Sequence, residues 1–231
     1  MKTILLAAGF GTRLRPLTDN IPKCLVPIKG KPLLQIWLER LSDADFKDFL
    51  INTHYLSNQV NDFIDSSMFK DKCIIKYEKS LLGTAGTLLS NLNFIGEEDC
   101  MLIHADNYCL ADFKEFIKSH NQRTSYCLMT MMTFRTDTPS SCGIVELDED
   151  NVVIGFHEKV KFPPGNLANG AIYILSSELI KIVKEEYAAA TDFSTEILHH
   201  FIGKIYTYET NNLFMDIGSP EAYLKANGFY E

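Results

Sequence analysis

Short apolar runs alternate along the chain with segments whose apolar residues recur at helical spacing. Residues 2–8 form a run that predicts a buried strand, and in residues 31–41 four apolar residues recur on one face and predict a helix with Pro32 in its first turn. The same patterns predict strands over 46–55, 73–78, 99–106 and 125–134, a helix capped by Ser57, and helices over 83–92 and 110–120. This alternation predicts a mostly parallel sheet that is covered on both faces.

The alternation of strand and helix patterns ends near residue 142. Residues 143–160 contain two strand patterns on either side of the polar turn 148–151, which is typical of a hairpin. Beyond it the pattern predicts a strand over 169–175, helices over 176–187 and 193–202, a strand over 204–209, and a last helix with Ser219 as cap and Pro220 as first residue. We therefore expect one α/β domain over residues 1–231, with a three-layer αβα arrangement, a mixed sheet and an added hairpin.

Composition narrows the class of protein. The chain has 231 residues, of which 46% are hydrophobic, and no apolar run is long enough to cross a bilayer. No charged and apolar leader precedes the first strand, so we expect a cytoplasmic protein that uses no membrane. The six cysteines form no C-x-x-C pair and no metal spacing, and we assign them no chemistry.

Charge is distributed unevenly. The net charge of −8 argues against a surface that binds nucleic acid. Residues 1–40, however, contain seven basic against two acidic residues, a balance of +5, around a turn at Gly9 and Gly11. Basic charge beside a glycine turn indicates a compact anion as ligand, or else ordinary surface lysines next to a loop.

The turn differs from the two best-known phosphate loops. It lacks the Gly-Lys-Ser/Thr of a Walker loop, and Leu14 stands where a dinucleotide fingerprint has its third glycine. Its backbone N–H groups can still face phosphate oxygens, because glycine lets another group approach closely. Arg13 suits bidentate phosphate contacts and Lys23 supplies a point charge; alternatively, both are ordinary surface side chains.

Residues 6–32, LAAGFGTRLRPLTDNIPKCLVPIKGKP, resemble the signature of the nucleotide-sugar pyrophosphorylases, which join a sugar 1-phosphate to a nucleoside triphosphate. Further segments resemble this family in the same order, namely 78–92, 102–107, 143–160, 166–175 and 214–227. The resemblance implies a Rossmann-like nucleotidyltransferase fold in which residues 1–110 mainly bind nucleotide and 140–218 mainly bind sugar phosphate. One departure is Ala105, since the family often has Gly before the first aspartate.

The resemblance also implies the site. The catalytic cations would be Arg13, toward the β- and γ-phosphates, and Lys23, toward the α-phosphate and the sugar phosphate. The residues that would bind nucleotide are Leu6, Ala7, Gly9, Gly11, Thr12, Glu78, Gly83 and Thr84; those for the sugar phosphate are Gly143, Glu158, Lys159 and Asn169; those for Mg²⁺ are Asp106 and Asp216. Local alternatives are turn carboxylates at Asp106 and Asp216, and an exposed ion pair between Glu158 and Lys159.

The implied reaction is Mg²⁺-dependent, in-line attack of a sugar 1-phosphate on the α-phosphorus of an NTP, releasing pyrophosphate. An ionised sugar phosphate needs no general base, so positioning and electrostatics carry the catalysis. General similarity favours a mannose 1-phosphate guanylyltransferase or a uridylyl relative, in the synthesis of cell-surface polysaccharide precursors, and allows a homodimer. We expect no added repeat domain. The alternatives are a cytidylyltransferase for phosphocholine and a nucleotide-sensing subunit without turnover.

Overall fold

The computed structural model describes residues 1–228 and divides them into two compact units. The N-terminal unit comprises Lys2–Leu82, Ile103–Leu110 and the chain from Leu213 onward. The central unit comprises Met1, Gly83–Leu102 and Ala111–Asn212. Neither unit is continuous in sequence, because strand β6 (Cys100–His104) passes from one unit into the other.

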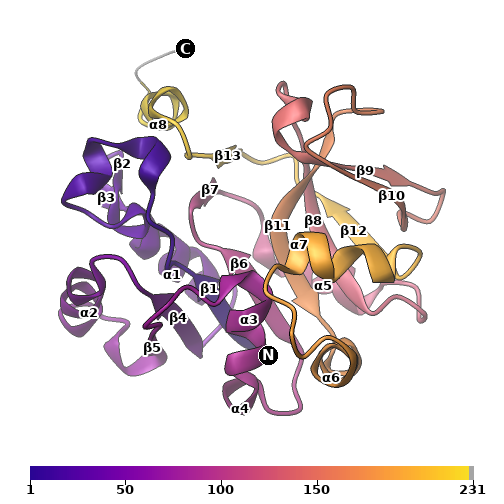
Figure 1. The fold of residues 1–231 in the computed structure, drawn as a ribbon, viewed down its shortest axis with the longest axis horizontal. Coiled ribbons are helices and arrows are strands. Elements are labelled where there is room, and N and C mark those ends of the chain that lie inside the picture. Colours follow the sequence, from indigo (N-terminus) through magenta and orange to yellow (C-terminus); the bar gives the residue numbers. More distant parts are fainter. Residues whose placement is uncertain (229–231) are drawn as a thin grey trace. The chain divides into compact units, whose positions relative to one another are not determined.

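Three parallel strands organise the N-terminal unit (Figure 1). β1 (Lys2–Leu6) pairs with β4 (Phe49–Thr53), and β4 pairs with β5 (Cys73–Tyr77). All five residues of β4 are buried, as expected for a strand that has paired neighbours on both sides. The two shorter pairings are antiparallel: β2 (Pro27–Ile28) with β3 (Lys31–Pro32), and β7 (Asn107–Cys109) with β13 (Phe214–Asp216).

The helices of this unit follow the predicted apolar faces, with one correction. α1 (Leu33–Asp43) buries the four predicted residues Leu34, Trp37, Leu38 and Leu41, and also Leu33. α8 (Pro220–Ala226) begins at Pro220, and its cap Ser219 accepts a hydrogen bond from Ala222 N as expected. The prediction of Ser57 as the cap of α2 (Ser57–Asp65) is wrong, because Leu56 in a left-handed conformation precedes the helix and Ser57 is its first residue.

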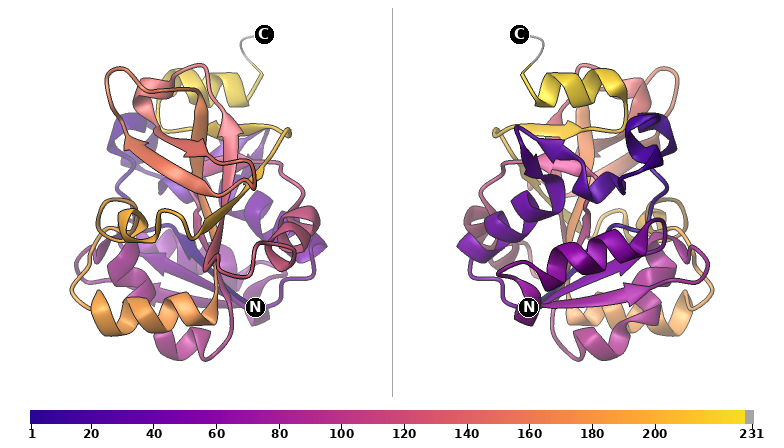
Figure 2. Two further views of the ribbon diagram at one scale, coloured as in Figure 1. Left: turned by 90° about the vertical axis from the view of Figure 1, so that its right-hand side faces the viewer. Right: turned by 90° about the vertical axis from the view of Figure 1, so that its left-hand side faces the viewer.

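The central unit contains a mixed set of strands. β8 (Met129–Arg135) pairs in parallel with β12 (Ile205–Glu209) and antiparallel with β11 (Leu167–Leu175). β9 (Gly143–Leu147) and β10 (Val153–Glu158) form the predicted hairpin, which stands out in the left view of Figure 2. Strands and helices together confirm the predicted α/β class with a mixed, mostly parallel sheet.

The helices of the central unit are α3 (Gly83–Ser90), α4 (Leu92–Ile95), α5 (Phe113–Asn121), α6 (Ser177–Glu186) and α7 (Phe193–Glu196). The predicted single helix over 193–202 is wrong. α7 ends at Glu196, Ile197 is its C-cap with φ −116° and ψ −51°, and a separate 3-10 turn follows at Leu198–Phe201. The β-branched residues Thr195 and Ile197 lower the helix propensity at this break.

Candidate active site

The glycine-rich loop that follows β1 is held by two side chains. Asn52 Oδ1, at the end of β4, accepts a hydrogen bond from Ala7 N at 2.7 Å, and Thr18 Oγ1 donates to the carbonyl of Gly11 at 2.7 Å. Gly11 has φ 64°, and a Cβ there would lie 3.1 Å from Cβ of Lys23, so this close turn favours glycine. Gly9 and Thr12 are exposed, which leaves the loop accessible to a ligand.

Glu78, predicted to face the nucleotide base, lies buried beside this loop. Its Oε1 accepts from Asn52 Nδ2 at 2.8 Å, and its Oε2 accepts from Leu82 N at 3.2 Å. Asn52 therefore links the loop to Glu78 through both ends of one amide. Sequence reasoning missed Asn52, although an amide inside the apolar segment 49–53 was a visible signal.

The structure brings together both predicted catalytic cations and both predicted metal ligands. Lys23 Nζ lies 2.8 Å from Asp106 Oδ2 and 3.6 Å from Asp216 Oδ1, and Arg13 Nη2 lies 3.6 Å from Asp216 Oδ2. The Lys23 side chain is 8% exposed, whereas that of Arg13 is 70% exposed. Lys23 is thus a fixed charge, while Arg13 can follow a ligand.

Strand pairing explains how two carboxylates 110 residues apart meet at Lys23. Asp106 lies two residues beyond the end of β6, and Asp216 ends β13. In the antiparallel β13–β7 pair, Asp216 stands opposite Asn107, the immediate neighbour of Asp106. The carboxyl end of a strand in an α/β sheet is where ligands collect.

Gly218 makes the close approach at Asp216 possible. A Cβ atom at residue 218 would lie 2.5 Å from Arg13 Nη2 and 2.8 Å from Asp216 Oδ1. Any larger side chain would displace the guanidinium or the carboxylate. Sequence reasoning did not select this glycine, since only the folded chain places Arg13 against it.

The electrostatics of the cluster keep Asp106 ionised. Burial raises the pKa of Asp106, but the charges of Lys23 and His104 outweigh it, and the pKa lies below its ordinary value of 3.8. Among residues 1–228 no group of three or more His, Cys, Asp or Glu could hold a metal ion. Two carboxylates nevertheless fit Mg²⁺, which is commonly held by one or two carboxylates together with substrate phosphates and waters.

Gly83 and Thr84 lie in the central unit, where they hold the start of α3. Gly83 has φ 77°, and a Cβ there would collide with the carbonyl oxygen of Thr191. That oxygen accepts from Ala85 N at 2.9 Å, and Thr84 Oγ1 accepts from Phe193 N at 2.7 Å. The turn is therefore shaped by a partner that sequence reasoning missed.

The four predicted sugar-phosphate residues also lie in the central unit. Glu158 ends β10 opposite Gly143 of β9, and a Cβ at Gly143 would lie 2.6 Å from Glu158 Oε2. Lys159 Nζ forms an ion pair with Glu158 Oε1 at 3.2 Å, as the alternative interpretation expected. Lys159 has φ 49°, an uncommon conformation that clusters at functional sites.

Asn169 on β11 has an ordered side chain. Its Nδ2 donates to the hydroxyl of Tyr173 at 2.7 Å, and its Oδ1 accepts from Ala171 N at 2.9 Å. Burial raises the pKa of Tyr173 to about 12, so its hydroxyl stays protonated near neutral pH. The sugar-phosphate roles of these residues stay predictions.

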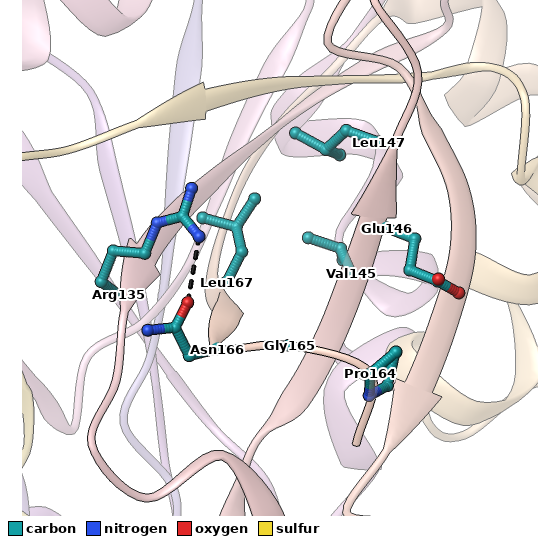
Figure 3. A pocket seen from close by; sticks show the side chains of 8 residues that line it. All are labelled: Arg135, Val145, Glu146, Leu147, Pro164, Gly165, Asn166 and Leu167. Atoms are coloured by element: carbon teal, nitrogen blue, oxygen red, sulfur yellow. Dashed lines mark hydrogen bonds between the residues drawn. The ribbon is translucent and has the colours of Figure 1, made fainter.

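A cavity of about 260 Å³ opens in the central unit between β9 and the end of β8 (Figure 3). Val145 and Leu147 point toward Leu167 and Arg135, whereas Glu146 points away. Sequence reasoning did not predict this cavity, because it forms where three strands separated in sequence diverge.

Residues 2–231 match the family model of the nucleotidyl transferases. The chain belongs to the nucleotidyl transferase family. A mannose-1-phosphate guanyltransferase of Candida glabrata is 29% identical over 100% of this chain and 64% of its own length. A D-glycero-α-D-manno-heptose 1-phosphate guanylyltransferase of Campylobacter jejuni is 29% identical over 96% of this chain and 97% of its own length.

A solved structure supports the same nucleotidyl transferase membership. HddC from Yersinia pseudotuberculosis, complexed with GMP-PN, superposes with a TM-score of 0.82 at 28% identity, covering 100% of this chain and 99% of the other. The chain spans less than two thirds of the length of several curated relatives, with shares of 62%, 64% and 54%. No helix in residues 1–228 is long and apolar enough to cross a membrane.

Proposed function

We propose that the chain transfers a nucleotidyl group from a nucleoside triphosphate to a sugar 1-phosphate and releases pyrophosphate. The observation that carries this proposal is the cluster of Lys23, Arg13, Asp106 and Asp216 beside the loop at Gly9–Gly11. Within the family, relatives that act on manno-configured sugars with guanine nucleotides favour guanylyl transfer to such a sugar, with uridylyl transfer as the next choice.

In the proposed reaction, a phosphate oxygen of the sugar 1-phosphate forms a bond to the α-phosphorus. The bond from that phosphorus to the oxygen that bridges to the β-phosphate breaks, and pyrophosphate leaves. The buried Lys23 ammonium compensates negative charge on the α-phosphate and on the attacking group. The exposed Arg13 guanidinium follows the β- and γ-phosphates, to which its planar fork is suited.

Asp106 and Asp216 would hold Mg²⁺, and the low pKa of Asp106 keeps it ionised for that purpose. When bound, Mg²⁺ would compensate charge on the phosphates. Both carboxylates contact the Lys23 ammonium, whose positive charge stabilises these two negative groups beside each other. Cytoplasmic location and a homodimer stay predictions; the free cysteines, Cys24, Cys73, Cys100, Cys109, Cys127 and Cys142, suit a reducing compartment.

The decisive experiment is pyrophosphate release with Mg²⁺, using GTP, UTP, CTP and dTTP in turn with a panel of sugar 1-phosphates and phosphocholine. We expect release with one triphosphate and a sugar 1-phosphate, reduced roughly 100-fold or more in Lys23→Ala and Asp106→Ala. Lys29→Ala, in an exposed turn, is the matched control and should keep wild-type activity. Release with CTP and phosphocholine alone, or nucleotide binding without any release, would replace the proposal with one of the two alternatives.

A further inference from the structure

Three of the predicted sugar-phosphate residues form one row across the strands β10, β9 and β11. Glu158 stands opposite Gly143 in the β10–β9 pair. In the antiparallel β11–β9 pair, Ala168 stands opposite Ile144, and this register puts their neighbours, Asn169 and Gly143, beside each other. Residues that oppose each other on paired strands direct their side chains to the same face. Asn169 and Glu158 therefore share a face and flank Gly143.

β11 has a bulge directly after Asn169. Asn169 stands opposite Thr133 of β8, and Tyr173 stands opposite Met131. Four steps along β11 thus cover the same length as two steps along β8, about 7 Å instead of the roughly 13 Å of a regular strand. Ala171 lies inside this bulge with φ 53°, an uncommon conformation for a residue other than glycine. The bulge therefore brings Tyr173 close enough to Asn169 for their side chains to meet.

The side-chain amide of Asn169 is held at both ends. Its Nδ2 donates to the hydroxyl of Tyr173 at 2.7 Å, and its Oδ1 accepts from Ala171 N at 2.9 Å. An amide side chain has two N–H donors and an oxygen that accepts twice, so these bonds use one of each. The other N–H and the other acceptor position match a sugar hydroxyl, which both accepts and donates a hydrogen bond. Asn169 is only half-buried, so its amide is accessible to such a group.

Tyr173 is fixed independently of Asn169. Its side chain is fully buried, and its ring centre lies 5.2 Å from that of Phe193 in α7. Its hydroxyl is also hydrogen-bonded to Ser194 of α7. Burial raises the pKa of this hydroxyl and the charge of Glu158 adds to the effect, so Tyr173 lies within electrostatic reach of the row. Because Ser194 already gives the buried hydroxyl a partner, the bond to Asn169 serves the amide rather than the tyrosine.

α7 is anchored from both sides and forms a rigid support for Tyr173. Phe193 N donates to Oγ1 of Thr84 at 2.7 Å, in the turn that is predicted to bind nucleotide. At the start of the helix, Asp192 Oδ1 accepts from Thr195 N at 2.8 Å. The same short helix therefore supports the predicted nucleotide turn through its backbone, and Tyr173 through a ring and a hydroxyl.

We propose that Tyr173 is a positioning residue for the sugar 1-phosphate, because its hydroxyl orients the amide of Asn169 that binds a hydroxyl group of the sugar. This inference rests on the proposed function and adds a residue to its sugar site. Tyr173 is buried and touches no reacting atom. It fixes one orientation of the Asn169 amide before the sugar binds, and this preorganisation lowers the entropic cost of binding.

The test uses the triphosphate and the sugar 1-phosphate that give turnover in the pyrophosphate assay. Tyr173→Phe keeps the ring that packs against Phe193 and removes only the hydroxyl. We expect KM for the sugar 1-phosphate to rise roughly threefold to tenfold, the usual size of one hydrogen bond, with KM for the triphosphate unchanged. Tyr206→Phe, which removes the hydroxyl of a half-buried tyrosine in β12, is the matched control and should alter neither value.

A double-mutant cycle separates positioning from a purely structural role. Asn169→Ala should raise KM for the sugar 1-phosphate at least as much as Tyr173→Phe does. Adding Tyr173→Phe to Asn169→Ala should cause no further rise, since the hydroxyl acts only through the amide. Ser194→Ala keeps both partners and should raise the same KM to a smaller extent. An unchanged sugar KM in Tyr173→Phe, equal rises of both KM values, or losses that multiply in the double variant would overturn the proposal.

If no sugar 1-phosphate is turned over, the proposed function fails, and binding decides the role of Tyr173 separately. Calorimetry then compares α-D-mannose 1-phosphate binding to the wild type and to Tyr173→Phe. Weaker binding to the variant supports the positioning role, whereas equal binding, or no binding to either protein, rejects it. Urea unfolding of each variant establishes that the compared proteins are folded.

Discussion

At the scale of single residues, the candidate site brings charged side chains of both signs within ion-pair distance of one another. Lys23 contacts two carboxylates from within the fold, and Gly218 leaves the space that Arg13 and Asp216 need. A buried cation between two acidic groups is a costly arrangement unless all partners remain in place. Gly218 therefore belongs to the site as much as its charged neighbours, although it has no side chain.

Gly218→Ala tests this requirement. The added Cβ would lie within 3 Å of both Arg13 and Asp216, so we expect kcat to fall roughly 10- to 100-fold. The free energy of unfolding should change by less than about 1 kcal/mol, because Arg13 and Asp216 are both half-exposed or more. Glu221→Ala, an exposed change in the first turn of α8, should affect neither quantity. Full activity in Gly218→Ala would show that the Arg13–Asp216 approach is dispensable.

At the scale of elements, short connecting segments position the site more than the regular structure does. The start of α3 is held by the carbonyl of Thr191, which Glu196 orders in turn: Thr191 Oγ1 donates to Glu196 Oε1 at 2.8 Å. These hydrogen bonds support the low pKa of Glu196, and so keep it an acceptor. The segment before α7 therefore fixes the turn at Gly83 and Thr84.

Gly83→Ala should be strongly destabilising. The residue has φ 77°, and its new Cβ would meet the backbone of Thr191, so we expect a loss of roughly 2 kcal/mol or more in the free energy of unfolding. Gly30→Ala is the matched control, since its φ is 80° and nothing lies within 4 Å of the added Cβ. Urea unfolding of both variants separates the backbone strain, which they share, from the collision, which only Gly83→Ala suffers.

A second element-scale prediction concerns pH. His120 of α5 is buried, and its Nδ1 lies 2.8 Å from Thr130 Oγ1 of β8 while its Nε2 lies 3.4 Å from Asp99 Oδ2. Burial lowers the pKa of His120 below its ordinary value of 6.5, an effect that Arg123 adds to and Asp99 opposes. The unfolded chain then takes up the proton first, so stability is complete above about pH 6.5 and falls as the pH drops through the folded pKa.

Urea titrations between pH 7.5 and 5.5 measure this loss. His120→Gln should be less stable at pH 7.5 but show a shallower decline toward pH 5.5, whereas His200→Gln, an exposed change, should retain the wild-type decline. Identical slopes in wild type and His120→Gln would place the titrating group elsewhere.

At the scale of the whole molecule, the two units are assembled from segments that are distant in sequence. β13 completes the pair with β7, and Asn227 Oδ1 accepts from Lys29 N at 2.7 Å. The N-terminal unit therefore requires the last part of the chain. Cutting the chain near residue 110 would remove β13 and α8 from this unit.

A fragment of residues 1–110 tests this dependence. Without β13 and α8, β7 loses its partner and Asp216 is absent, so we expect no cooperative unfolding transition and no triphosphate binding. The full chain, prepared in parallel, should show both. A sharp transition in the fragment would mean that its parallel strands suffice for a stable core.

Local patterns were enough for much of the fold, and their failures have local causes. The helix at 33–43, the hairpin around 148–151 and the cap at Ser219 follow from periodicity and turn chemistry, which involve neighbouring residues only. The prediction of Ser57 as the cap was wrong because Leu56, in a left-handed conformation, precedes the helix. The side-chain pattern does not predict this backbone conformation. The break at Ile197 was missed because its apolar spacing continues smoothly across it.

The sequence by itself determined the family and the chemical groups of the candidate site, since the glycine loop, Arg13, Lys23 and the two aspartates are visible as motifs in order; their roles stay predictions. Only the tertiary structure decided that Asp106 and Asp216 meet at Lys23, that Asn52 joins the loop to Glu78, and that a cavity opens between β9 and the end of β8. These contacts join segments tens to more than a hundred residues apart. Strand register and packing select them, and neither is encoded in any single stretch of the chain.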